Sequence, residues 1–138
     1  MPGEFLDSNV LVYAFTTDQR ALRAQELLDR GCAVGVQGLN EFTNVARRKL
    51  DMTWDEVRAA LTAIRALCRM VLPIDINTHT DALRIAERYG YGIFDALMVA
   101  SALRANCGVL WSEDMQDGIV IDGRLTIANP FHAINSPT

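Results

Sequence analysis

The spacing of apolar residues along the chain follows two periods, which predict a succession of strands and helices. Short apolar runs that end at turn-forming or charged residues predict strands at residues 4–6, 32–36, 71–74, 108–111 and 124–127. Apolar residues that recur every three or four positions predict helices at residues 8–15, 18–29, 39–50, 53–69, 78–89 and 94–105. Thr53 with Glu56 has the pattern of a capping box, and Gly90 suits a helix C-terminus.

Strands and helices alternate along the chain, so the strands must be joined by long crossovers. This order favours a mostly parallel central sheet of about five strands, with helices on both faces and right-handed crossovers. The chain contains no internal repeat and no linker rich in proline or glycine, and we predict a single α/β domain over residues 1–138. Ligands of such sheets bind beyond the carboxyl ends of the strands.

The positions of the cysteines and histidines argue against a protein stabilised by disulfides and against one stabilised by zinc. The three cysteines, Cys32, Cys68 and Cys107, are odd in number and widely spaced, which does not fit a disulfide framework. His79 and His132 lie far apart and form no zinc-binding pattern with the cysteines. Half of the residues are hydrophobic, enough for a core without such links. We expect small, buried, free thiols in a reducing cytoplasm.

The hydropathy and the charge of the chain bear on its location and its ligand. The first residues lack the basic start of a signal peptide, and no apolar run reaches the roughly 18–20 residues that span a membrane, which predicts a cytoplasmic protein. The net charge is −4, from 13 basic and 17 acidic residues. Since nucleic-acid binding needs positive charge, either the ligand is not a nucleic acid or the excess acid is concentrated where cations neutralise it.

Four acidic residues stand where the predicted topology makes a ligand site. Asp7 follows the first strand directly, and Asp114 follows the fourth strand within a few residues. Glu41 begins the helix after the second strand, and Asp95 lies in the first turn of an apolar helix. Singly, each suits a helix N-cap or a first-turn acid. Asp7 and Asp95 are also flanked by apolar residues, where a carboxylate is costly unless it is paired or binds a metal.

Carboxylates that converge on one sheet edge repel each other, and their pKa values rise. A divalent cation removes this conflict, and ligands that are all oxygen favour Mg²⁺ or Mn²⁺ over Zn²⁺. Four acids around one or two such cations are typical of phosphodiester hydrolysis, in which the metal activates a water. The sequence shows no serine–histidine triad that would point to other hydrolytic chemistry.

These acidic segments resemble those of the PIN-domain nucleases and, within them, the VapC-like toxins of type II toxin–antitoxin modules. The match spans almost the whole chain in the same order. The segments that carry it are residues 5–13 (FLDSNVLVY), 39–42 (LNEF), 94–102 (FDALMVASA) and 111–118 (WSEDMQDG). The late Asn129-Pro130-Phe131 is similar to one VapC-like subgroup. The resemblance implies a three-layer, PIN-like α/β fold and a Mg²⁺-dependent endoribonuclease, in which Mn²⁺ could take the place of Mg²⁺.

The resemblance also implies roles for individual residues. Its acidic quartet maps to Asp7, Glu41, Asp95 and Asp114, of which Asp7 and Asp95 would be the principal metal ligands. Glu41 and Asp114 would complete the shell, partly through water.

Three further residues and one basic cluster are assigned around this quartet. Ser112 would orient a ligand or a water, and Asn9 would hydrogen-bond near the first aspartate. Asp117 is an additional acid that we expect to be exposed. Arg47, Arg48 and Lys49 form the best basic cluster, either as an RNA contact or as a solvated helical face.

The resemblance implies two protein partners. One is a second copy of the chain, in a homodimer. Because the hydrophobic content is higher than one small core needs, we expect the contact on apolar helix surface that includes residues 59–68. The other is a small antitoxin whose C-terminal segment covers the active site.

Aspartates at the edge of a parallel sheet also occur in other classes of protein. A phosphoacceptor receiver domain needs a lysine beside the acidic pocket, whereas the only lysine, Lys49, lies in the middle of a predicted helix. A haloacid-dehalogenase-type phosphatase needs Asp-x-Asp after the first strand, where this chain has Asp7-Ser8-Asn9. Two alternatives stay open: a PIN-like scaffold that acts through a protein partner without catalysis, and a nuclease that acts on DNA.

Overall fold

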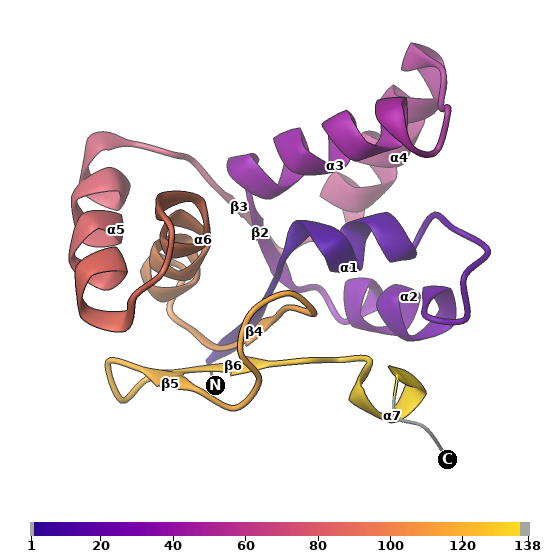
Figure 1. Ribbon diagram of the computed structural model, residues 1–138. Coiled ribbons are helices and arrows are strands. Elements are labelled where there is room, and N and C mark those ends of the chain that lie inside the picture. Colours follow the sequence, from indigo (N-terminus) through magenta and orange to yellow (C-terminus); the bar gives the residue numbers. More distant parts are fainter. Residues whose placement is uncertain (1, 136–138) are drawn as a thin grey trace.

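A computed structural model describes residues 2–135 of the chain (Figure 1). Within these residues the strands are β1 (Gly3–Leu6), β2 (Ala33–Gly35), β3 (Met70–Leu72), β4 (Cys107–Trp111), β5 (Val120–Ile121) and β6 (Leu125–Ala128). The helices there are α1 (Ser8–Tyr13), α2 (Ala21–Asp29), α3 (Val36–Arg48), α4 (Trp54–Leu67), α5 (Ile76–Tyr89), α6 (Ile93–Arg104) and α7 (His132–Asn135).

The strands form one sheet in the order β3-β2-β1-β4-β6-β5. All neighbouring pairs are parallel except β5 and β6, which are antiparallel. The first strand lies between β2 and β4, with Phe5 opposite Ala33 and Leu6 opposite Trp111. The carboxyl ends of β1, β2 and β4 therefore meet at one edge of the sheet.

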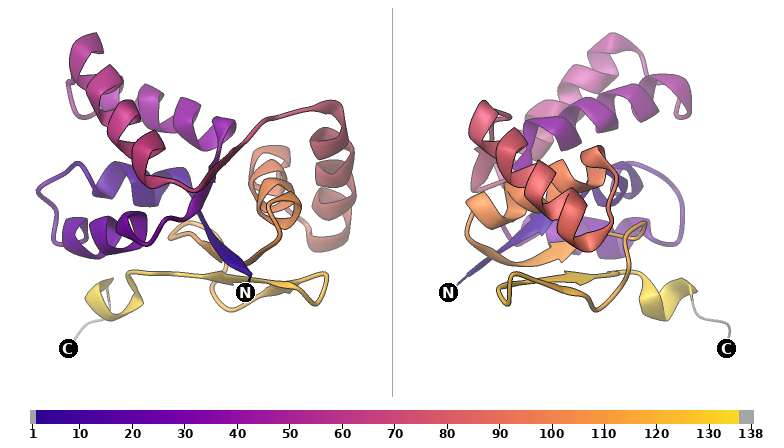
Figure 2. Two further views of the ribbon diagram at one scale, coloured as in Figure 1. Left: turned by 180° about the vertical axis from the view of Figure 1, so that it is seen from behind. Right: turned by 60° about the vertical axis from the view of Figure 1, so that its left-hand side comes forward.

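Helices cover both faces of the sheet, as Figures 1 and 2 show. Side chains of α5 and α6 pack on one face around Phe5 and Leu110, and side chains of α1, α2, α3 and α4 pack on the other around Leu6 and Val34. Phe5 and Leu6 enter opposite cores because successive side chains of a strand point to opposite faces. The three-layer α/β fold predicted from the sequence is confirmed.

The structure differs from the sequence prediction mainly at short elements and at helix starts. The sheet has a sixth strand, β5, whose two residues are too few to show a period. The short helix α7 was also not predicted. The third helix begins at Val36, directly after β2, instead of at residue 39. The predicted caps are present: Thr53 and Glu56 form both bonds of a capping box, and Gly90 ends α5 with a φ of 75°.

The cysteines and the lengths of the helices bear on two further expectations. The three cysteines are free, with Cys32 and Cys107 buried and Cys68 partly exposed. Over residues 2–135, every helix is too short or too polar to cross a membrane.

Candidate active site

Asp7 lies at the carboxyl edge of the sheet, where it ends β1 and caps the N-terminus of α1. Its side chain is buried, with 6% of the residue exposed. Oδ1 accepts a hydrogen bond from the Ser8 backbone N–H (2.6 Å), and Oδ2 accepts one from the Ser112 hydroxyl (2.7 Å). Ser112 follows β4, the neighbour of β1, so the parallel pairing of these strands places the two side chains together.

The environment of Asp7 favours its neutral form. Burial is the main cause, and it raises the pKa of Asp7 to about 6, against the lowering effect of the Ser112 and Ser8 hydrogen bonds. The negative charges of Glu41 and Asp114 raise this pKa further. The cost of an ionised carboxylate at this position is what a bound cation would remove.

Glu41 reaches the same site from α3. The prediction that it begins its helix is wrong, because α3 starts five residues earlier, at Val36. Its Oε2 accepts a hydrogen bond from the Ser8 hydroxyl (2.7 Å), and its Oε1 accepts one from Nε2 of Gln37 (2.8 Å). Gln37 also donates to the backbone carbonyl of Phe94 (2.9 Å), which joins α3 to the first turn of α6.

Asp95 lies in the first turn of α6, as predicted, and Asp114 lies in the loop after β4. The expectation that Asp95 is surrounded by apolar side chains is wrong: Asp95 is exposed, and its neighbour Phe94 is 69% exposed. Partial desolvation nevertheless raises the pKa of Asp95, and the charges of Asp114 and Glu41 raise it further. Nδ2 of Asn9 donates to Asp114 Oδ2 (3.1 Å) and, at 3.4 Å, to Asp7 Oδ2.

The structure thus gathers four predicted acids from four different segments closely enough that the charges of Glu41 and Asp114 act on both Asp7 and Asp95. Asp117 stands outside this group. It is exposed, as expected, and its Oδ1 accepts a bond from the Asn129 backbone N–H (2.7 Å). Its contact is therefore with the chain after β6.

The predicted basic cluster at the end of α3 divides into different environments. All three side chains are exposed. Arg47 lies over the ring of Trp54 (4.5 Å to its centroid) and donates to the Met52 carbonyl (2.8 Å), so it holds the turn between α3 and α4. Lys49 instead lines a cavity of about 320 Å³ that Asn9, Tyr13 and Asp114 also line.

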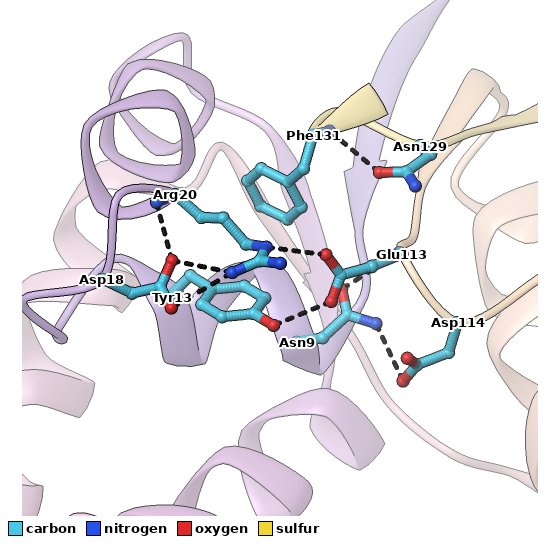
Figure 3. A network of polar contacts seen from close by, with 8 residues as sticks. All are labelled: Asn9, Tyr13, Asp18, Arg20, Glu113, Asp114, Asn129 and Phe131. Atoms are coloured by element: carbon cyan, nitrogen blue, oxygen red, sulfur yellow. Dashed lines mark hydrogen bonds and ion pairs between the residues drawn. The ribbon is translucent and has the colours of Figure 1, made fainter. Parts of the chain in front are cut away.

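Several residues that sequence reasoning did not single out take part in the site. They are Ser8 and Gln37, which hold Glu41, and Tyr13, Asp18 and Glu113, which form a network with Arg20 beside Asp114 (Figure 3). Gln37 stands one helical turn before Glu41, and this spacing of four residues is a signal that could have identified it. Burial and the hydrogen bond to Glu113 raise the pKa of Tyr13 to about 12, so its hydroxyl remains a donor.

The donors at this edge suit a hard divalent cation. They are carboxylates, with no histidine or cysteine among the residues described above, and oxygen donors favour Mg²⁺ or Mn²⁺. Within residues 2–135, no three histidine, cysteine, aspartate or glutamate side chains are arranged so that they could hold a metal ion as they stand. The carboxylates therefore fit such a cation by chemistry and charge, and they would have to draw closer to ligate it.

The fold and the site place this chain among the mostly parallel α/β proteins, which bind their ligands at the carboxyl edge of the sheet. In this chain the carboxylates gather at that edge. Residues 5–116 match the model of the PIN domain, so this chain belongs to the PIN domain family. The comparison with curated proteins gave no match.

Solved structures share the fold. A toxin–antitoxin complex from Klebsiella pneumoniae aligns with a TM-score of 0.70 and 17% identity, over 92% of this chain and 97% of the other. VapBC2 from Rickettsia felis, bound to a promoter DNA fragment, aligns at 0.65 and 18%, over 91% and 97%. VapC20 from Mycobacterium tuberculosis, a toxin that cleaves the sarcin–ricin loop, aligns at 0.60 and 19%, over 80% and 89%. At these identities the likeness establishes a common fold.

Proposed function

We propose that this chain is a Mg²⁺-dependent endoribonuclease, the toxin of a type II toxin–antitoxin system. The observation that carries the proposal is the gathering of Asp7, Glu41, Asp95 and Asp114 at one sheet edge, where burial and neighbouring charge disfavour the ionised form of Asp7. Membership of the PIN domain family and the fold shared with VapC toxins support it.

In this proposal Asp7 and Asp95 are the principal ligands of the cation, with Glu41 and Asp114 completing the shell, and Mn²⁺ can replace Mg²⁺. The bound cation would supply the activation of a water and the neutralisation of charge on the scissile phosphate. The chain itself keeps the ligands oriented. The Ser112 hydroxyl donates a hydrogen bond to Asp7, and the Asn9 side-chain amide donates one to Asp114.

The cavity beside the carboxylates supports a polynucleotide substrate. Lys49 lines it together with Glu113 and Asp114 of the acidic loop, so a strand that crosses the cavity could place one phosphate near Lys49 and the next near the carboxylates. RNA is the preferred substrate because VapC20, which has this fold, is a toxin that cleaves an RNA loop. The DNA in the Rickettsia felis structure is a fragment of the VapBC2 promoter.

Two protein partners belong to the proposal. An antitoxin is supported by the complexes that share the fold, and the exposed Phe94, next to Asp95, offers it an apolar contact beside the active site. A homodimer, formed through apolar helix surface that includes residues 59–68, is the second. We place these events in the cytoplasm.

The proposal is tested by cleavage of an RNA pool and a matched DNA pool, with Mg²⁺ and with EDTA. Wild type should cut RNA only with the metal. Asp95→Asn should reduce this cleavage at least 100-fold, because loss of a group that merely orients a metal ligand already costs about 10–100-fold. Asp81→Asn is the matched control, since Asp81 is a partly exposed acid of α5 that pairs with Arg104.

Each outcome assigns the chain to one class. Cleavage of RNA that disappears in Asp95→Asn supports the proposal. Cleavage of DNA alone would mean that the chain is a nuclease whose substrate is DNA and not RNA. Full activity of Asp95→Asn would remove that residue from the mechanism. If wild type cuts neither pool with either metal, the chain is better described as a PIN-like scaffold that acts through a partner.

A further inference from the structure

Glu113 is a fifth acid beside the quartet, and its side chain points away from that of its neighbour Asp114. It directly precedes Asp114 in the loop after β4, yet Figure 3 shows its carboxylate turned toward α1 and the segment before α2. Oε1 accepts a hydrogen bond from the Tyr13 hydroxyl (2.7 Å), and Oε2 accepts one from Nε of Arg20 (2.9 Å). The Glu113 side chain is only 18% exposed. Both of its oxygens are thus occupied by strong donors.

The two donors are themselves held in place. Nη1 of Arg20 donates to both carboxylate oxygens of Asp18 (2.9 and 3.1 Å), and its guanidinium lies over the Tyr13 ring, 5.1 Å from the centroid. The Tyr13 ring meets Phe131 edge-on, with 5.1 Å between the centroids, and Phe131 is fully buried. The hydroxyl and the guanidinium therefore present a preformed receptor for one carboxylate.

This receptor fixes Glu113, the middle residue of the segment 112–114, whose last residue is Asp114. Ser112 bonds to Asp7, Glu113 bonds to Tyr13 and Arg20, and Asp114 accepts a bond from Asn9. The Glu113 backbone N–H also donates to Asn9 Oδ1 at 3.4 Å. Asp114 is exposed, so packing does little to place it, and its position depends on the residues on either side.

We propose that Glu113 is a positioning residue: Tyr13 and Arg20 anchor its carboxylate, and this anchor holds Asp114 at the carboxylate cluster. Arg20 also balances the charge of Glu113, so the fifth acid does not add to the repulsion among the other four. The effect on metal binding rests on the proposed nuclease function, whereas the anchoring is a property of the metal-free chain.

The test uses Tyr13→Phe, which removes the hydroxyl and keeps the ring against Phe131. In metal-free protein, the backbone amides of Glu113 and Met115 should exchange hydrogen about tenfold faster, because the hydrogen bonds that they donate, to Asn9 Oδ1 on α1 and to the Ser112 hydroxyl, open more often once the segment is loosened. Mn²⁺ binding, followed by electron paramagnetic resonance, should require about tenfold more metal for half-saturation at an unchanged melting temperature. A purely structural role would lower the melting temperature and leave the metal requirement unchanged.

Two controls make the result specific. Tyr89→Phe removes another hydroxyl that bonds to a carboxylate, that of Asp122 (3.2 Å), and it should change neither the exchange at residues 112–115 nor the Mn²⁺ requirement. Glu113→Gln keeps one acceptor oxygen and should fall between wild type and Glu113→Ala. In the Glu113→Ala background, Tyr13→Phe should have no further effect, because the two residues act through one contact.

Unchanged exchange at residues 112–115 in both Tyr13→Phe and Glu113→Ala would overturn the proposal. So would an effect of Tyr13→Phe that persists in full without Glu113. If wild type binds no Mn²⁺, the proposed nuclease function fails, and the exchange measurement still decides whether Glu113 anchors the segment.

Discussion

At the scale of single residues, Asp7 shows how a functional group can oppose the stability of its own fold. Its folded-state pKa of about 6 is higher than the ordinary value of 3.8, mainly because the carboxyl is buried. The folded chain therefore holds the proton more tightly than the unfolded chain does. Without metal, the contribution of Asp7 to stability is fully present below about pH 4 and is lost as the pH rises toward 6.

Asp7→Asn should therefore stabilise the metal-free protein at pH 7 by roughly 1–3 kcal/mol, since each pKa unit corresponds to about 1.4 kcal/mol. The gain should disappear near pH 4, where wild-type Asp7 is protonated in the folded chain. Urea unfolding in EDTA at both pH values measures it. Asp55→Asn, at a fully exposed side chain of α4, should not reproduce the gain. Equal pH dependence of wild type and Asp7→Asn would contradict the assigned burial cost.

At the scale of elements, the sequence predicted those parts of the site that depend on local order along the chain. Asp7 and Asp114 could be placed because each follows a strand, and parallel strands end at one edge. Asp95 could be placed because its helix has a strong apolar pattern. The motif around Glu41 was recognised, but its helix start was misjudged because the residues from Val36 onward follow a strand without a turn signal.

The parts that escaped prediction depend on contacts between distant residues. Gln37 bonds to the carbonyl of Phe94, 57 positions away, and Glu113 bonds to Tyr13 and Arg20, 100 and 93 positions away. No periodicity within one helix or strand carries such pairings. The strand β5 consists of two residues, and it exists because it pairs with β6.

The link between α3 and α6 leads to a prediction about Gln37. It is buried, and its Oε1 has no hydrogen-bond partner among the described residues, so Gln37→Leu should change the free energy of unfolding by less than about 1 kcal/mol. Cleavage should nevertheless fall about tenfold in kcat/KM, because Glu41 loses a charge-assisted hydrogen bond that orients it. Urea unfolding and initial rates at fixed Mg²⁺ measure the two effects.

Gln25→Leu is the matched control, because Gln25 donates to the Ala14 backbone instead of to a carboxylate. An unchanged cleavage rate in Gln37→Leu would show that Ser8 alone is sufficient to hold Glu41.

At the scale of the whole molecule, the net charge of −4 must be reconciled with the polyanionic substrate that we propose. Part of the acid is compensated internally, as Arg20 does for Glu113 and Arg84 for Asp122. Among the predicted basic cluster, Lys49 is the residue that lines the cavity beside the carboxylates. Association with RNA should therefore depend on few phosphate contacts and on the divalent cation.

This leads to a binding prediction for Lys49→Gln, made in an Asp95→Asn background so that RNA stays intact. Affinity for a mixed-sequence single strand should fall, and the slope of log K against log salt should become shallower by about 0.7, the value for one phosphate contact. Fluorescence anisotropy at several salt concentrations measures the slope. Arg58→Gln, on the exposed face of α4, should leave it unchanged. An unchanged slope in Lys49→Gln would show that Lys49 does not contact a phosphate of the RNA.

The packing of Phe131 against Tyr13 joins positions 118 residues apart and so bears on the order in which the molecule becomes complete. During synthesis, the quartet is present once residue 114 has emerged, but the ring that supports Tyr13 arrives only after the two strands that follow, β5 and β6. A nascent chain halted between these two points would carry every acid and lack the support for one of them. Full assembly of this edge of the sheet thus waits for Phe131, and the proposed nuclease activity would wait with it.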